Sequence, residues 1–213
     1  MVEMAGKRSE SVLIIFSKNA QKGKVKTRLA STLGESAAFR VFQIMLQRIR
    51  KAVSELSIDK AVFFSDYIDN SEEWCSSSFR KFVQKGEDIG NRMGQAFSVM
   101  FNQGYKHVCL IGTDCYALQP QIIHKTFELL QTHSLVLGPA NDGGYYLIAL
   151  SGPAPWLFEG VNWSTPHVLA QTIQHATRFG QKYALVDELV DIDTESDLKK
   201  AAPLLWQQIK QNG

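Results

Sequence analysis

The sequence of 213 residues has little of what marks secreted, fibrous or membrane proteins. Its three cysteines, Cys75, Cys109 and Cys115, are odd in number and lack C-x-x-C spacing, which argues against a disulfide framework or a zinc knuckle. With only 15 glycines and 6 prolines, collagen-like and low-complexity classes are excluded. The longest apolar run, Tyr145 to Leu150, is far shorter than the ~18 residues of a membrane span. We therefore expect a globular protein without a membrane span, cytoplasmic by default.

Acidic residues are also missing from one stretch, between Ser11 and Gly34. The formal net charge is only +2, too small for a general polyanion-binding surface, so we expect no nucleic-acid partner. The positive charge is instead concentrated in one short loop, which contains Lys18, Lys22, Lys24, Lys26 and Arg28.

The length and the patterning predict one domain. Residues 1–10 are expected to form a flexible tail and residues 11–213 a single domain. Apolar runs predict strands at 12–16, 61–64, 79–83, 108–111, 135–137, 145–150 and 183–186. Spacings of three and four predict helices over 39–56, 89–101, 122–130 and 168–176, and from 194 onward.

The alternation of strands and helices predicts an α/β fold with an open, mostly parallel sheet between two helical layers. The strands at 135–137 and 145–150 are too close for a helical crossover, which favours an antiparallel pair. In such folds ligands bind beyond the carboxyl ends of the strands.

The basic loop follows the first predicted strand and precedes a helix. Gly23 permits close backbone approach and the cations supply charge, so the loop is typical of a phosphate site. It matches neither the P-loop nor the G-x-G-x-x-G fingerprint. A solvated basic loop is the alternative interpretation.

Aspartates at two other places are candidate metal ligands. Asp114 ends a predicted strand, where a carboxylate could hold a divalent cation over the crevice or simply form a turn or helix cap. In an extended segment Asp191 and Asp193 point to the same side, and their mutual repulsion favours a cation nearby. Thr194 and Asp197 form a capping box. The D-x-D-x-T string also occurs in haloacid-dehalogenase-type phosphatases, but too few residues follow for that fold.

Two further segments have both a structural and a functional interpretation. Gly143 and Gly144 lie in a turn between strands, and their uncovered backbone N–H groups could also contact an acceptor. The segment Trp163 to Thr165 could line a pocket, or precede a helix that Thr165 and Pro166 start.

Six motifs together resemble one family of uncharacterised bacterial proteins, described as glycosyltransferase-like or as radical-SAM/selenodomain-associated transferase 1. They occur in the family's order across nearly the whole chain: KGKVKTRL in the basic loop, GEDIGNRM at 86–93, IGTDC at 111–115, GPANDGGYYLIAL at 138–150, NWST at 162–165 and DIDTESDL at 191–198. The chain departs from the family's pattern at Ala20 and Tyr116, where proline is usual.

The resemblance implies the three-layer GT-A fold of nucleotide-diphospho-sugar transferases and a relationship to the guanylyltransferases that act on phospholactate or phosphoenolpyruvate. It implies nucleotide binding by Lys26 and Arg28, a magnesium or manganese ion on Asp114, Asp191 and Asp193, and acceptor contacts near Gly143, Gly144, Ser164 and Thr165. The remaining expected nucleotide contacts are Lys18, Gly23, Lys24, Gly86, Arg92 and Thr113. The remaining expected acceptor contacts are Asp142 and Trp163.

The predicted activity is metal-dependent nucleotidyl transfer from a nucleoside triphosphate to a small phosphorylated or carboxylated acceptor, with release of pyrophosphate. Lys26, Arg28 and Asp114 would be the catalytic residues, acting by position and charge rather than as nucleophiles. Glycosyl transfer from a nucleotide sugar is one alternative. A non-catalytic nucleotide-binding protein is another.

Overall fold

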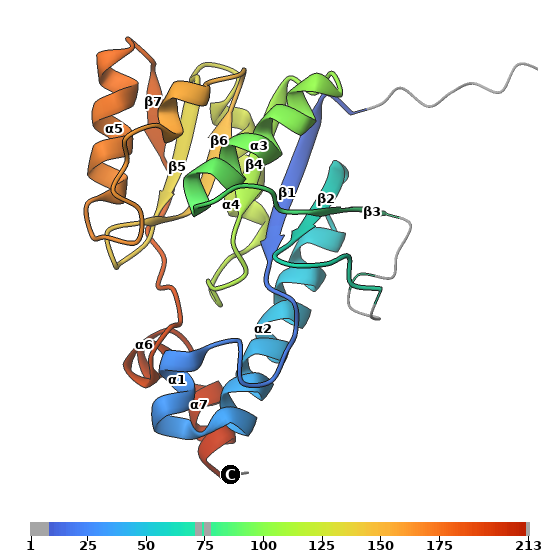
Figure 1. The fold of residues 1–213 in the computed structure, drawn as a ribbon, viewed down its shortest axis with the longest axis vertical. Coiled ribbons are helices and arrows are strands. Elements are labelled where there is room, and N and C mark those ends of the chain that lie inside the picture. The colour runs from blue at the N-terminus through green and yellow to red at the C-terminus, as the bar shows by residue number, and fades with distance from the viewer. Residues whose placement is uncertain (1–8, 71–73, 75–77, 212–213) are drawn as a thin grey trace, which may run out of the picture.

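The computed structural model of the protein describes residues 9–70, 74 and 78–211 (Figure 1). Most of the expected N-terminal tail and Cys75 lie outside these residues. Within the described part of the chain, no helix combines the length and the apolar character that crossing a bilayer requires.

One mixed sheet of seven strands forms the centre of the described structure. The strand order is β3-β2-β1-β4-β6-β5-β7, and β6 is antiparallel to both its neighbours while the other pairs are parallel. The antiparallel β5–β6 pair confirms the expectation from their short connection. The strands are β1 (Ser11–Ser17), β2 (Asp59–Phe64), β3 (Phe79–Val83), β4 (His107–Ile111), β5 (Leu135–Pro139), β6 (Tyr145–Leu150) and β7 (Tyr183–Leu185).

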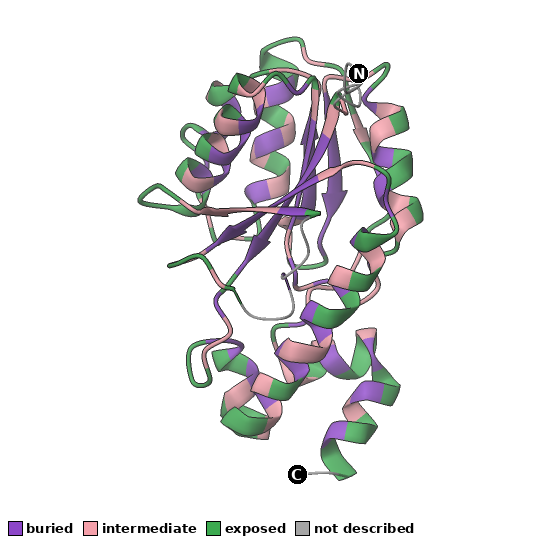
Figure 2. Cartoon of the chain, turned by 90° about the vertical axis from the view of Figure 1, so that its right-hand side faces the viewer, coloured by how far each residue is buried: buried purple, intermediate pink, exposed green. Residues whose placement is uncertain are grey.

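Helices cover both faces of this sheet, which confirms the three-layer α/β fold (Figure 1). On one face, α2 and α4 pack on side chains such as Leu13 and Ile15. On the other face, α3, η2 and α5 pack on Val12 and Ile14. The helices are α2 (Glu35–Ser54), α3 (Ile89–Asn102), α4 (Pro120–Leu129), η2 (Pro155–Phe158) and α5 (Val168–Arg178). Because alternate residues of β1 enter opposite cores, the strand is buried along almost its whole length. Figure 2 shows that the strands of the sheet are mostly buried.

A helical lobe extends from the carboxyl ends of the strands (Figure 1). It consists of α1 (Thr27–Leu33), α6 (Glu195–Ala201), α7 (Pro203–Gln211) and the first turns of α2. Its own small core includes Leu29, Met45, Ile192 and Leu198. The lobe therefore joins the segment after the basic loop to the segment around Ile192, which are far apart in sequence.

The expectation of one helix from Thr194 onward is corrected by a break at Ala202. Pro203 has no backbone N–H to continue the hydrogen-bond ladder, and residues before proline avoid the helical conformation, so a second helix starts there. The predicted capping box is confirmed: the Thr194 side chain accepts a hydrogen bond from the Asp197 N–H, and the Asp197 carboxylate accepts one from the Thr194 N–H.

Candidate active site

The basic loop leaves the carboxyl end of β1 and is fixed at its start by Asn19. The Asn19 side chain is buried, and its Oδ1 accepts hydrogen bonds from the Ser65 hydroxyl and the Asp66 N–H, at 3.2 and 3.0 Å. Its Nδ2 donates to the Tyr67 carbonyl. The loop after β1 is thereby tied to the loop after β2. No local pattern indicates this role of Asn19, because its five bonds with residues 65–67 span 46 to 48 positions.

Lys26 is the most constrained cation of the loop. Its backbone adopts the left-handed conformation, with φ 50° and ψ 43°, immediately before α1. The side chain is 4% exposed, and Nζ lies 2.5 Å from the Asp114 carboxylate and 3.5 Å from that of Asp193. Nζ also donates to the Ile192 carbonyl at 2.5 Å. Burial opposes the charged form, but the Asp114 charge and hydrogen bond, with the charges of Asp193 and Asp191, outweigh it and raise the pKa of Lys26.

Asp114 and the segment 191–193 are held side by side by backbone contacts. Cys115 and Asp191 form an isolated antiparallel bridge, and the Ile192 N–H donates to the Asp114 carbonyl at 3.0 Å. Arg28, on the first turn of α1, reaches Asp193 at 3.8 Å with its side chain 77% exposed. The structure therefore brings Lys26, Arg28, Asp114 and Asp193 together, as the sequence analysis expects.

Asp191 has a different environment from Asp193. Its carboxylate accepts a hydrogen bond from the Cys115 thiol at 2.6 Å, whereas Asp193 faces Lys26 and Arg28. Burial, with the charges of Asp114 and Asp142, raises the pKa of Asp191 to about 6 despite the thiol hydrogen bond. Two aspartates separated by one residue thus have separate partners.

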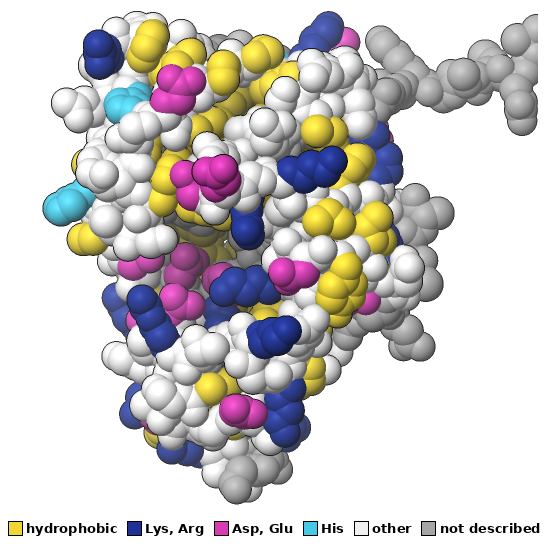
Figure 3. All heavy atoms as spheres, viewed as in Figure 1, with side chains coloured by type: hydrophobic (Ala, Val, Ile, Leu, Met, Phe, Trp, Pro, Cys, Tyr) yellow, Lys and Arg dark blue, Asp and Glu magenta, His cyan; other side chains and the backbone are white. Residues whose placement is uncertain are grey.

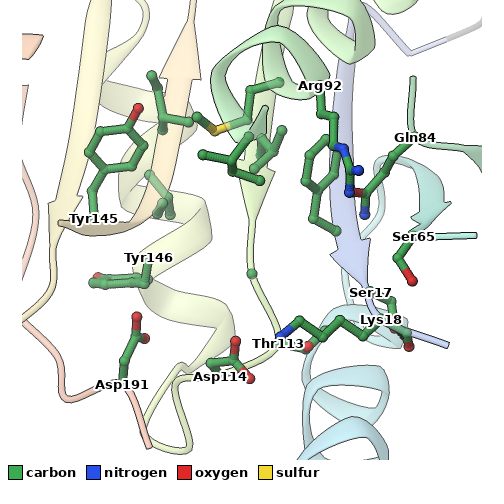
Figure 4. Close-up of a pocket in the computed structure, with 17 residues that line it drawn as sticks. Ser17, Lys18, Ser65, Gln84, Arg92, Thr113, Asp114, Tyr145, Tyr146 and Asp191 are labelled. Carbon is green, nitrogen blue, oxygen red and sulfur yellow. Dashed lines mark hydrogen bonds between the residues drawn. The ribbon is translucent and has the colours of Figure 1, made fainter. Parts of the chain in front are cut away.

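Two adjoining hollows meet at this cluster. The first, of about 280 Å³, is lined by the ends of β1, β4 and β6 and by α3 (Figure 4). The second, of about 240 Å³, lies beside the helical lobe and is lined by Lys18, Lys26, Thr27, Arg28, Phe42, Asp114 and Asp193. Lys18 and Asp114 line both. In Figure 3 basic and acidic side chains border the depression between the main body and the lobe.

The expected nucleotide contacts divide into two groups. Lys18, Arg92 and Thr113 line the 280 Å³ hollow. Gly23, Lys24 and Gly86 line neither hollow. Gly86 supports the site indirectly, since its carbonyl accepts a hydrogen bond from Arg92 Nε at 3.2 Å.

Other residues of the first hollow were not predicted from the sequence. Figure 4 places Ser65 and Gln84 on the side of Arg92, and Tyr145 and Tyr146 on the opposite side, near Asp191. Only their positions after or at the ends of predicted strands could have indicated them.

The turn 140–144 corrects the expectation of free backbone N–H groups. The Gly143 N–H donates to the Ala140 carbonyl, and the Gly144 N–H donates to Asp142 Oδ1 at 2.9 Å. Both donors are therefore used inside the turn. Gly143 has φ 87°, and a Cβ there would lie 2.1 Å from the Pro166 carbonyl oxygen, so the glycine is explained by close packing.

The segment 162–166 packs on α3 and on this turn rather than on either hollow. The Trp163 indole lies against Gly90, where a Cβ would approach Nε1 to 2.2 Å. Ser164 has φ 60°, and Thr165 Oγ1 donates to the Asn162 carbonyl at 2.7 Å. The expectation that Thr165 starts a helix is wrong, because this turn precedes α5, which begins at Val168.

Tyr116, which stands where the family usually has proline, lines neither hollow. The Tyr116 ring packs under the Arg48 guanidinium of α2, 4.3 Å from ring centroid to Cζ, and its carbonyl accepts from Arg48 Nε. The side chain therefore stabilises the contact between α2 and the turn after β4.

The carboxylates of the cluster fit a divalent cation in part. In the described ranges 9–70, 74 and 78–211, no group of three His, Cys, Asp or Glu side chains is arranged to hold a metal. The expected triad is thus reduced to Asp114 and Asp193 around one position, with Asp191 beside Cys115. Two carboxylates still fit magnesium, which proteins often hold through one or two carboxylates together with substrate phosphates.

Comparison with known proteins identifies the family of the chain. The model of the family described as uncharacterized proteins conserved in bacteria (DUF2064) matches residues 46–165, more than half of the chain. The chain belongs to this family. The match includes Asp114 and the turn 140–144, whereas the basic loop and Asp191 to Asp193 lie outside it. No curated protein matches the chain.

Solved structures extend the likeness to nearly the whole chain. A protein from Desulfovibrio desulfuricans G20, assigned provisionally to the nucleotide-diphospho-sugar transferases, is 26% identical, with a TM-score of 0.85, over 96% of this chain and 95% of its own. The 4-diphosphocytidyl-2C-methyl-D-erythritol synthase of Anaerococcus prevotii is 12% identical, with a TM-score of 0.61, over 92% and 96%.

The inositol-1-phosphate CTP transferase of T. maritima is 14% identical, with a TM-score of 0.56, over 95% of this chain and 97% of its own. These neighbours are transferases, as the family resemblance predicts, and the two less similar ones show the shared fold.

Proposed function

We propose that this protein is a nucleotidyltransferase, which moves a nucleoside monophosphate from a nucleoside triphosphate to a small acceptor. The observation that carries the proposal is the second hollow, where Lys18, Lys26 and Arg28 face Asp114 and Asp193 at the carboxyl ends of β1 and β4. Carboxyl ends of strands are where α/β sheets bind ligands. Cations facing carboxylates suit a phosphate chain together with a metal ion.

The two hollows suit different parts of a nucleotide. The first hollow has apolar walls, including Phe16, Ile89 and Met93, which suit a nucleoside. The second has the cations, which suit the phosphates. Because Lys18 and Asp114 border both, the α-phosphate would lie near these two residues, with the β- and γ-phosphates toward Arg28.

In the reaction, an acceptor oxygen attacks the α-phosphorus, the new O–P bond forms, and the bond to pyrophosphate breaks. Lys26 and Arg28 would stabilise the negative charge that develops on the leaving pyrophosphate. Asp114 and Asp193 would hold a magnesium or manganese ion, which when bound would polarise the phosphate oxygens. We propose a phosphorylated or carboxylated acceptor, by analogy with the family resemblance, entering from the side of Tyr146 and Asp191.

Glycosyl transfer is a second candidate because the D. desulfuricans protein is assigned provisionally to nucleotide-diphospho-sugar transferases. A thermal-shift panel of nucleoside triphosphates and nucleotide sugars, each with and without magnesium, distinguishes the two, since a ligand stabilises by RT ln(1 + [L]/Kd). Preference for a triphosphate supports nucleotidyl transfer. Preference for a nucleotide sugar would replace the proposal with glycosyl transfer.

The variant Asp114→Asn tests the site itself. It removes the charge that faces Lys26 and the proposed cation, so magnesium-dependent affinity for the preferred nucleotide should fall at least tenfold while the circular dichroism spectrum stays that of the folded protein. Glu128→Gln, on the exposed surface of α4, is the matched control and should bind normally. Full magnesium-dependent affinity in Asp114→Asn would contradict the assignment.

A further inference from the structure

Lys26 combines backbone strain with deep burial, an unusual combination for a lysine. Among the described residues, Lys26 and Ser164 are the two non-glycine residues with positive φ. The left-handed conformation is sterically unfavourable for an L-residue, and glycine would avoid this strain. Strain of this kind persists where the surrounding structure fixes it, and it is concentrated at functional sites. The strained backbone therefore has to be explained by what the side chain does.

The side chain delivers its ammonium into a space surrounded by oxygen atoms. Nζ contacts the Ile192 carbonyl and the Asp114 carboxylate at 2.5 Å each, and the Asp193 carboxylate at 3.5 Å. An ammonium has three donors and no acceptor, so three oxygens match its capacity. With 4% of the side chain exposed, the charge is neutralised by protein groups rather than by water.

The same oxygens are those that a divalent cation would use. Asp114 and Asp193 are the two carboxylates that fit magnesium, and both contact Nζ. An ammonium and a divalent cation cannot share one position, because the two positive charges would repel strongly in a partly buried site.

We propose that Lys26 reserves this position. In the nucleotide-free protein its ammonium occupies the oxygen-lined space and excludes divalent cations. A metal ion enters only together with a nucleotide. The triphosphate offers the ammonium new oxygen partners and offers the cation additional ligands. The ammonium can therefore move to the phosphate oxygens as the cation binds the carboxylates. The proposal rests on the proposed function for the identity of the nucleotide, but its central statement concerns metal binding without nucleotide.

The test is a gain of metal binding. Lys26→Gly removes the ammonium and suits φ 50°, so the loop should keep its shape. Mn²⁺ binding is measured by electron paramagnetic resonance with no nucleotide present. Wild type should bind Mn²⁺ weakly, and Lys26→Gly should bind it at least tenfold more tightly. Adding Asp114→Asn to Lys26→Gly should abolish the gain, which locates the ion.

Matched variants separate this effect from loss of one positive charge. Lys22→Gly makes the same change in net charge at an exposed residue of the same loop and should gain no Mn²⁺ affinity. If Lys26→Gly does not fold, Lys26→Asn carries the test, since asparagine tolerates the left-handed conformation. Equal Mn²⁺ affinity in wild type and the Lys26 variant, or an equal gain in Lys22→Gly, would overturn the proposal.

This outcome is independent of the nucleotide panel. A protein that binds no triphosphate but whose Lys26→Gly variant gains Mn²⁺ binding would support the reserved position and reject nucleotidyl transfer. A protein that binds magnesium triphosphate but shows no gain in the variant would keep the proposed function and reject the role of Lys26.

Discussion

The loop side of the crevice, which is the basic loop from Lys18 to Arg28, and its turn side, which is the turn 140–144, contain similar residue types. The contacts that these residues form differ. On the loop side, the Lys26 side chain binds groups 88 to 167 positions away in sequence, in Asp114 and in the segment 192–193. On the turn side, the Asp142 carboxylate and the Gly143 N–H form their hydrogen bonds within the turn itself. A polar group with local partners is explained by turn geometry. A charged group held by distant segments requires another explanation, and the proposed function supplies one.

The largest expected effect tests the structural role of the turn side. Gly143→Ala should lower the free energy of unfolding by roughly 3 kcal/mol, because alanine at φ 87° is strained and its Cβ would collide with the Pro166 carbonyl. Chemical denaturation measures the loss, and the folded fraction should keep its nucleotide affinity. Normal stability with impaired acceptor-dependent turnover would instead make this turn part of the active site.

A smaller effect is expected at Asp191, between the two sides. Its pKa is about 6 in the folded protein and near 3.8 in the unfolded chain. The folded protein therefore binds a proton that the unfolded chain has lost, so the stabilising contribution is complete below pH 3.8 and is lost as the pH rises through 6. At pH 8 the buried charge is a cost, and Asp191→Asn should raise stability by roughly 1–3 kcal/mol.

The measurement is urea denaturation of wild type and Asp191→Asn with a chelator present, at several pH values. The difference in the free energy of unfolding should shrink from pH 8 downward and disappear near pH 4. Lower stability of the variant at pH 8 would show that the Asp191 charge is compensated more fully than its burial suggests.

The smallest effect on stability is expected at Arg28. Its side chain is 77% exposed and its contact with Asp193 is 3.8 Å long, so Arg28→Ala should change the free energy of unfolding by less than about 0.5 kcal/mol. Its affinity for a nucleoside triphosphate should nevertheless fall by roughly tenfold, as measured by calorimetry, because Arg28 lines the second hollow. Lys22→Ala should bind nearly as wild type. Equal losses in both variants would indicate attraction by the loop as a whole.

The sequence predicted the fold well because the patterns that indicate strands and helices are local. The buried run in β1 and the three-and-four spacing in α2 are properties of single segments, and each was found in the expected place. The short connection between β5 and β6 likewise predicted their antiparallel pairing. The break before Pro203 could have been expected from proline alone.

The candidate site was predicted only in part, because its details depend on tertiary contacts. Charge and position after a strand were enough to select the basic loop and Asp114, and the family resemblance singled out Lys26 and Arg28 within the loop. No local pattern distinguishes Asp191 from Asp193, whose partners come from the turn after β4 and from the basic loop. The same holds for Asn19, whose side chain is satisfied by the loop after β2.

The helical lobe sets an order of events during synthesis. The sheet as far as β6 is encoded by residues up to 150, but the carbonyl that receives the Lys26 ammonium belongs to Ile192, 166 positions after it. A ribosome-bound chain can therefore have these strands formed while the second hollow still lacks the wall that Asp193 provides. Catalytic competence would arise late in translation. Nascent chains that end before Ile192 would be partly folded but inactive.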